Sequence, residues 1–293
     1  IETIMSMAEY KRTGRAKALV VAGCLAELHK KELKSELSEA DAIMGLSERD
    51  RIPETCLRLL GRSPEGEPEY IRVVSGPRHS AYLRISEGCN NVCSYCAIPV
   101  IRGHFRSVPE DEILAEAQEL AQTGARELIL IGQDTTNYGI DLDNSSLPRL
   151  LEKLSAIEQI RWLRLLYAHP AHMSEEIIEA VADLPKMLPY IDIPIQHISS
   201  KILRRMGRFT SPEEIRALLR RLRDRIPGLA LRTSLMVGFP GESESDFRAL
   251  LNFITEIRFE RLGAFTYSRE EGTRAALLED AVPEEAANER YDE

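Results

Sequence analysis

Hydrophobic and polar residues alternate in two rhythms along most of the chain, and these rhythms predict strands and helices in turn. Short apolar runs predict strands at residues 81–85, 127–131, 162–166, 190–195, 229–237 and 261–266. Apolar residues at helical spacing predict helices at residues 109–122, 147–156, 174–182, from 210 onward and 246–257. Repeated strand and helix units are typical of a parallel sheet covered by helices, so we predict an α/β core domain over residues 80–283.

The helix predicted at residues 109–122 also has a local start signal. Ser107 is followed three residues later by Glu110. This spacing is typical of a capping box, in which each side chain satisfies a backbone N–H at the helix start.

The first sixty residues show the same alternation on a smaller scale. Helical patterns cover the opening segment through Tyr10 and residues 26–37 and 53–60, and apolar runs predict strands at residues 18–22 and 42–44. Residues 61–79 are rich in glycine, proline and charge, and one short strand is predicted there at residues 70–74. We therefore predict an α/β domain at residues 1–60 and a linker at residues 61–79.

Three of the five cysteines are grouped as Cys89-x3-Cys93-x2-Cys96. The odd number of cysteines and the lack of a signal peptide in this sequence favour soft-metal ligation over disulfides. Three thiolates on one side of a short loop can bind three irons of a cubane cluster and leave the fourth iron open. Zinc is the alternative, but structural zinc needs a fourth ligand, which His104 could supply.

The remaining two cysteines have simpler interpretations on spacing alone. Cys24 follows the strand at residues 18–22, at the carboxyl end where open α/β sheets place their sites. Its spacing favours a small buried thiol. For Cys56 the sequence predicts no chemistry.

Polar and glycine-rich segments follow five of the predicted strands. They are the cysteine loop and residues 132–139, 168–170, 196–199 and 238–242. Because the carboxyl ends of parallel strands meet at one rim, we expect these segments to form one site. No polar residue in them is assigned a catalytic proton transfer.

Composition narrows the class of protein. The 293 residues are 43% hydrophobic and 29% charged, which is ordinary for a globular protein. No apolar run approaches membrane-spanning length, so we expect a cytoplasmic protein without membrane contact. The net charge of -9 disfavours a broad grip on nucleic acid and favours a basic protein partner.

The cysteine motif, with Tyr95 before its last cysteine, resembles the signature of the radical S-adenosylmethionine (SAM) enzymes. The resemblance implies a partial (β/α)6 TIM-like barrel. It also implies a 4Fe-4S cluster on Cys89, Cys93 and Cys96, whose open iron binds SAM. One electron from the cluster then yields a 5′-deoxyadenosyl radical.

Residues 20–27, around Cys24, are similar to the end of the amino-terminal domain of the methylthiotransferases. The resemblance implies that residues 1–60 are part of a flavodoxin-like domain and that Cys24 is a ligand of an auxiliary 4Fe-4S cluster. This replaces the buried-thiol interpretation. The two partner cysteines are expected upstream of residue 1, which leaves the auxiliary cluster incomplete in this chain. Residues 284–293 are expected to start a linker to a missing TRAM domain.

The resemblance also suggests residues that contact the cofactor. Residues 233–242 are similar to the strand that lies along the adenosine in this family, and residues 206–208 form a further group pattern. The candidate cofactor-binding residues are Tyr95, Gln133, Gln196, Arg208, Val237 and Gly238.

Residues 133–139 and 192–197 resemble the branch of the family that modifies a ribosomal protein. That branch adds a methylthio group to the β-carbon of an aspartyl residue in a small-subunit ribosomal protein. The reaction implies two SAM molecules and an electron donor such as flavodoxin or ferredoxin. Two alternatives stay open: a tRNA (N6-isopentenyladenosine) methylthiotransferase, and a binding domain stapled by zinc.

Overall fold

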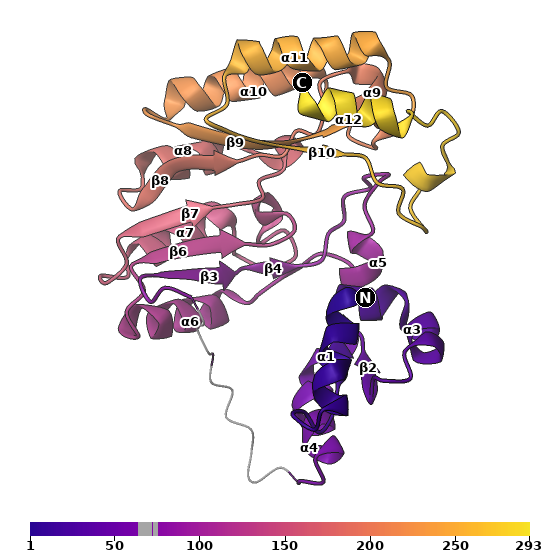
Figure 1. Cartoon of the computed structure of the whole chain (residues 1–293). Coiled ribbons are helices and arrows are strands. Elements are labelled where there is room, and N and C mark those ends of the chain that lie inside the picture. The colour runs from indigo at the N-terminus through magenta and orange to yellow at the C-terminus, as the bar shows by residue number, and fades with distance from the viewer. Residues whose placement is uncertain (64–71, 73–75) are drawn as a thin grey trace. The chain divides into compact units, whose positions relative to one another are not determined.

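The protein forms two compact units in a computed structural model that describes residues 1–63, 72 and 76–293 (Figure 1). The first unit comprises residues 1–73 and 98–103, and the second comprises residues 74–97 and 104–293. Among the described residues, no helix has the length and apolar character needed to cross a membrane.

The second unit is built on one six-stranded sheet. Its strand order is β10-β9-β8-β7-β6-β3, and every neighbouring pair is parallel. Each strand therefore lies beside the strand of this sheet that follows it in the chain. This is the arrangement of a partial (β/α) barrel, and the predicted fold class is confirmed. The strands are β3 (Ser80–Arg84), β6 (Glu127–Ile131), β7 (Trp162–Leu165), β8 (Met187–Asp192), β9 (Ala230–Val237) and β10 (Arg261–Thr266).

Helices connect these strands on the outer side of the sheet, where α10 and α11 lie over β9 and α6 lies beside β3 (Figure 1). Serine residues start four of them, and each serine oxygen accepts a backbone N–H of the first turn. The helices are α6 (Glu110–Gln122), α7 (Leu147–Ser155), α8 (Glu175–Asp183), α10 (Pro212–Arg225) and α11 (Glu244–Ile257).

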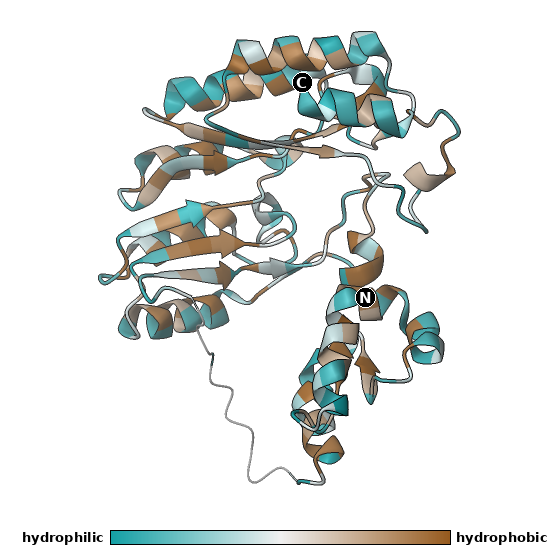
Figure 2. Ribbon diagram, in the orientation of Figure 1, coloured by the Kyte–Doolittle hydropathy of each residue, from teal (hydrophilic) through white to brown (hydrophobic). Residues whose placement is uncertain are grey.

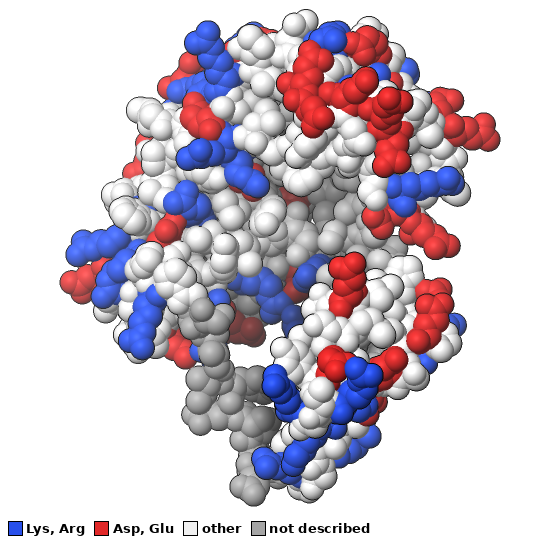
Figure 3. Space-filling model, in the orientation of Figure 1, with Lys and Arg blue, Asp and Glu red and all other residues white. Residues whose placement is uncertain are grey.

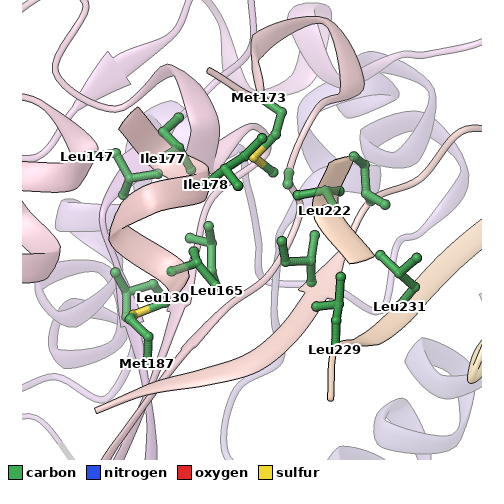
Figure 4. Close-up of a cluster of buried hydrophobic side chains, with 14 of the residues drawn as sticks. Leu130, Leu147, Leu165, Met173, Ile177, Ile178, Met187, Leu222, Leu229 and Leu231 are labelled. Atoms are coloured by element: carbon green, nitrogen blue, oxygen red, sulfur yellow. The ribbon is translucent and has the colours of Figure 1, made fainter. Parts of the chain in front are cut away.

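The core lies between the helices and the sheet. Side chains of β9 alternate between buried and half-buried, and Leu130, Leu165 and Leu231 of three strands are fully buried. Met173, Ile177 and other helix-side residues pack against these strands (Figure 4). In Figure 2 hydrophobic residues gather on β6, whereas α12 is largely hydrophilic. Burying one such side chain stabilises the fold by about 1.5–3 kcal/mol.

The capping box predicted for α6 is wrong. Pro109 is the N-cap, and no side chain caps the helix. Ser107 instead lies in β5 (Arg106–Ser107), which pairs with β4 (Ser86–Glu87), and its Oγ accepts the N–H of Gly139 at 2.9 Å. Glu110 forms an ion pair with Lys153. Both side chains therefore bind partners that are distant in sequence, and neither bonds to a backbone N–H at the start of α6.

Other boundaries differ from the sequence prediction. β8 ends at Asp192, three residues earlier than expected, although Gln196 still forms an isolated bridge with Leu235 of β9. Two short α-helices were not predicted: α5 (Ile98–Arg102) and α9 (Ser200–Arg205).

The first unit has a small core of its own. Ala26, Leu33 and Leu37 are buried together with Ile43, which belongs to a two-stranded parallel sheet. The helix predicted at residues 26–37 is divided in two, and the strand predicted at residues 70–74 lies largely outside the described residues. The elements are α1 (Glu2–Arg12), β1 (Val20–Ala22), α2 (Cys24–Leu28), α3 (Lys30–Glu36), β2 (Ala42–Met44), η1 (Leu46–Arg51) and α4 (Ile52–Leu59), together with α5.

The segment expected to start a linker forms a helix, α12 (Glu284–Asp292), which packs on β9 and β10 (Figure 1). Arg290 of this helix donates to the carboxylate of Glu242 at 2.7 Å, and the Glu242 side chain is fully buried. A Cβ added at Gly238 would lie 2.5 Å from the Cβ of Ala287. The helix is therefore an integral part of the second unit.

The close approach of α12 predicts a destabilising substitution. Gly238 and Gly228 both have a φ of +71°, so alanine at either position costs about 1–2 kcal/mol of backbone strain. Only Gly238→Ala also meets Ala287, which adds about 1–3 kcal/mol of overpacking, because nothing lies within 4 Å of a Cβ at Gly228. Urea unfolding should show the larger loss of unfolding free energy for Gly238→Ala. Equal losses in the two variants would contradict the packing of α12 against β9.

Candidate active site

The segments that follow β3, β6 and β7 meet at the carboxyl rim of the sheet. The N–H of Gly88 donates to Oε1 of Gln133 at 2.7 Å, which ties the cysteine loop to the segment after β6. Thr135 Oγ1 donates to the carbonyl of Leu166 at 2.6 Å, which ties that segment to the end of β7. The fold thus brings together polar segments that lie far apart in the sequence.

The cysteine loop holds three cysteines that are not in disulfides. Cys89 is buried, and Cys93 and Cys96 are partly exposed. Two donors from Asn91 reach Sγ of Cys89: the backbone N–H at 3.4 Å and Nδ2 at 3.3 Å. Burial raises the pKa of the Cys89 thiol, and these two hydrogen bonds oppose that rise. The arrangement suits a metal-bound thiolate, because N–H donors compensate the charge on a buried sulfur.

Ser94, in the middle of the motif, anchors the loop. Its N–H donates to the carbonyl of Met206 at 2.7 Å, and its Oγ donates to the carbonyl of Arg205 at 2.7 Å. Its own carbonyl accepts the N–H of Ala275 at 2.8 Å. The loop is therefore held from the end of α9 and from the segment after β10.

Arg208 and Tyr95 lie together beside Cys93. Arg208 is 8% exposed, and it donates to the carbonyl of Pro194 at 2.6 Å and to the Tyr95 hydroxyl at 3.4 Å. Its Nη1 also lies 4.0 Å from Sγ of Cys93. Burial raises the pKa of Tyr95 well above its ordinary value, although Arg208 opposes the rise. Tyr95 is therefore a neutral donor or acceptor at this site.

Asp134 is a buried carboxylate with four hydrogen-bond donors. Its Oδ2 accepts from Nδ2 of Asn91 at 2.8 Å, Nδ2 of Asn137 at 2.9 Å and Nδ1 of His172 at 2.7 Å. Its Oδ1 accepts from Thr136 at 2.6 Å. Burial acts to raise the pKa of Asp134, but the bonds from His172 and Thr136 outweigh it and hold the pKa below its ordinary value.

One possible metal-ligating atom from each of Asp134, His169 and His172 lies within 4.8 Å of the other two, which is close enough for the three to bind one cation. However, the Asp134 carboxylate already accepts four hydrogen bonds, so we interpret it as a hydrogen-bond acceptor rather than a metal ligand. The sequence alone does not single out Asp134, because its bond to Asn91 spans 43 positions in the chain.

The other candidate cofactor residues are placed less directly against the cysteines. Gln133 braces the loop through Gly88, as described above. Gln196 has a φ of +69° and exchanges backbone hydrogen bonds with Ser234 and Met236 of β9. Val237 is buried in the core, and Gly238 accommodates α12. The cofactor roles of these residues stay predictions.

Cys24 lies in the first unit, at the start of α2 and exposed. Nη2 of Arg102, the last residue of α5, lies 3.9 Å from its sulfur. Cys56 is half-buried within α4.

Comparison with known proteins identifies the class of fold to which this cysteine loop and parallel sheet belong. The family model of the radical SAM superfamily matches residues 83–254. The radical SAM methyltransferase TsrM of Kitasatospora setae has a TM-score of 0.55 at 18% identity, covering 67% of this chain and 38% of that chain. Coproporphyrinogen III oxidase of Escherichia coli has a TM-score of 0.54 at 17% identity, covering 72% and 49%. The chain belongs to the radical SAM superfamily.

Curated relatives identify a narrower family. The ribosomal protein uS12 methylthiotransferase RimO of Heliobacterium modesticaldum is 48% identical, covering 99% of this chain and 65% of the relative. That of Geobacter sulfurreducens is 47% identical, covering 99% and 68%. The chain belongs to the RimO family of methylthiotransferases, as predicted, and spans about two thirds of the length of these relatives.

The buried rim predicts a dependence of stability on pH. Burial, and then the charge of Arg208, lower the pKa of His169 to about 3, and its Nδ1 accepts the N–H of Ala171 at 3.2 Å. The unfolded chain binds a proton near pH 6.5 and the folded chain does not, so stability present above pH 6.5 is lost as the pH falls towards 3. His169→Asn keeps an acceptor for Ala171 and removes this titration. Between pH 7.5 and 5, wild type should lose about 1–2 kcal/mol more unfolding free energy than the variant.

The exposed His79 provides a matched control for this measurement. His79→Asn should keep the wild-type loss of stability over the same pH range. If His169→Asn and wild type lose the same unfolding free energy in urea titrations, the neutral buried state assigned to His169 is wrong.

Proposed function

We propose that this chain carries the radical core of an enzyme that replaces a hydrogen on the β-carbon of an aspartyl residue with a methylthio group. The substrate is a small-subunit ribosomal protein. One observation carries the proposal. A loop of three cysteine thiols, with N–H donors on its buried sulfur, lies at the carboxyl rim of a chain similar to RimO over 99% of its length.

The residues of the loop fit a 4Fe-4S cluster. Cys89, Cys93 and Cys96 supply three thiolates, and an open fourth position is what a SAM-binding cluster requires. Radical SAM enzymes use an iron–sulfur cluster and SAM, and when bound the cluster would supply the electron that cleaves SAM reductively. The zinc alternative would need His104 as a fourth ligand, but this exposed histidine is paired with Oδ1 of Asn90 at 3.3 Å.

The chain's own residues shape the rest of the site. Arg208 places a buried positive charge beside Cys93, where it compensates the charge of a thiolate and orients Tyr95. Abstraction of a hydrogen atom from carbon needs no general base, which agrees with a rim whose carboxylate, Asp134, is occupied by four donors. The residues of the rim therefore position and desolvate the reactants rather than transfer protons.

Cys24 would be one ligand of an auxiliary 4Fe-4S cluster that holds the sulfur to be transferred. The guanidinium of Arg102 beside it supports this role, because its positive charge would compensate the negative charge of a bound cluster. One SAM would then donate the methyl group and a second would supply the radical. An electron donor of the flavodoxin or ferredoxin class completes the proposal.

Charge supports a protein substrate over tRNA. The net charge is -9, and acidic side chains gather over α12 at the upper right of the space-filling view (Figure 3). Proteins that bind ribosomal RNA carry basic surfaces, and such a surface complements this one, whereas RNA phosphates are repelled. A cytoplasmic location, where ribosomes are modified, remains a prediction.

The substrate assay tests this proposal. The full-length enzyme, which would include the upstream cysteines expected for the auxiliary cluster, is reconstituted and incubated anaerobically with SAM, a strong reductant, and either small-subunit ribosomal protein or tRNA. Both substrates are then analysed by mass spectrometry. A methylthio adduct should appear on an aspartyl residue of the protein and not on tRNA. An adduct on tRNA alone would instead establish the nucleic-acid-modifying branch.

Two cysteine variants control the assay. Cys93→Ala should stay folded and lose 5′-deoxyadenosine formation and the adduct to background, because one cluster ligand is missing. Cys56→Ala should retain both, since Cys56 lies within α4 of the first unit. Cleavage of SAM by Cys93→Ala would refute the cluster assignment.

A further inference from the structure

We infer that Asn91 and Asp134 form a positioning pair that sets the reduction potential of the cluster at Cys89. Asn91 donates hydrogen bonds to the ligand sulfur, and Asp134 fixes the orientation of the Asn91 amide. The inference rests on the proposed cluster, but not on the identity of the substrate.

Asn91 donates two hydrogen bonds to the buried sulfur of Cys89. Cys89 is 9% exposed, so water gives its sulfur little solvation. Asn91 supplies two N–H groups instead, from its backbone at 3.4 Å and from its side chain at 3.3 Å. Cys93, by comparison, lies 4.0 Å from the guanidinium of Arg208. Cys89 thus has its own local donor set.

Asp134 fixes the orientation of the Asn91 side-chain amide. Nδ2 of Asn91 has two hydrogens, and it lies within bonding distance of both Sγ of Cys89 and Oδ2 of Asp134, the latter at 2.8 Å. An ionised carboxylate can only accept hydrogen bonds, so Asp134 requires the nitrogen, and not the oxygen, of Asn91 to face it. The same orientation directs the second N–H at the sulfur. Asp134 therefore acts through Asn91.

The Asp134 side chain is itself held in place by hydrogen bonds. It is 1% exposed, and Asn137, His172 and Thr136 donate to its two oxygens in addition to Asn91. With four donors on one buried carboxylate, the side chain is fixed before any cofactor binds. The Asn91 amide is consequently preorganised.

The consequence follows from electrostatics. Reduction adds negative charge that is shared by the cluster and its sulfur ligands, and N–H donors to sulfur stabilise that charge. Loss of the Asn91 side-chain donor should therefore make reduction harder. Asn91 and Asp134 are positioning residues, because Asn91 acts through the sulfur of Cys89 and Asp134 acts through Asn91.

The direct test is the midpoint potential of the reconstituted cluster, measured by anaerobic redox titration with optical or EPR detection. Asn91→Ala should shift the potential to more negative values while retaining the wild-type iron and sulfide content. Asn90→Ala is the matched control, because Asn90 is the same residue type on the same loop. The Asn90 side chain accepts from the N–H of Phe105 at 3.0 Å, and Asn90→Ala should keep the wild-type potential.

A double-mutant cycle tests the role of Asp134. Asp134→Asn removes a charge and allows the Asn91 amide to turn over, so the shift caused by Asn91→Ala should be smaller in this background than in wild type. Equal shifts in both backgrounds would overturn the part assigned to Asp134.

The remaining outcomes separate this inference from the proposed function. If the cluster forms and Asn91→Ala keeps the wild-type potential, the inference is overturned while the cluster assignment stands. A wild-type protein that binds no iron at these cysteines would overturn both. Failure to methylthiolate the ribosomal protein, with the potential shift observed, would overturn only the proposed substrate.

Discussion

The site depends on the hydrogen bonds between Ser94 and the end of helix α9. The last carbonyls of a helix have no partner within the helix, and those of Arg205 and Met206 accept from Oγ and N–H of Ser94. The cysteine loop and the helix end therefore satisfy each other's polar groups. A Cβ at Gly207 would lie 2.5 Å from the carbonyl of Val92, so glycine there permits the close approach. Hydrogen bonds from Ser94 to these helix-end carbonyls therefore anchor the loop that carries the three thiols.

Buried charge is used in the same way elsewhere on the rim. The carboxylate of Glu242 is fully buried and contacts Arg290 at 2.7 Å, and it lies 3.4 Å from Nε2 of His197. Removing one partner of such a buried group costs about 3–5 kcal/mol, because the other is left uncompensated. The ion pair of Arg290 with Glu242 thus joins helix α12 to the segment after β9. Asp134 plays the corresponding part beside the cysteine loop.

Much of the fold could be predicted because it is local. The strands at residues 127–131, 42–44 and 261–266 coincide with β6, β2 and β10, since an apolar run bounded by turns records a buried strand directly. The misses involve partners distant in sequence. Ser107 pairs with Gly139 instead of capping α6.

In the candidate site, too, residues that belong to local sequence patterns were predicted, and a residue that depends on distant partners was not. The three cysteines were found from their spacing alone, and the resemblance to a known family supplied Tyr95 and Arg208, which lie together in the structure. Asp134 was missed as a central residue, because its importance comes from donors on the cysteine loop and on the segment after β7. No local pattern in one sequence records such convergence.

The central claim is that Cys89, Cys93 and Cys96 hold an iron–sulfur cluster that cleaves SAM. Anaerobic reconstitution with iron and sulfide, followed by metal and acid-labile sulfide analysis and an assay for 5′-deoxyadenosine, tests it most directly. The account predicts a brown protein that contains iron and sulfide and forms 5′-deoxyadenosine under a strong reductant. A colourless protein that binds zinc without sulfide and leaves SAM intact would contradict it.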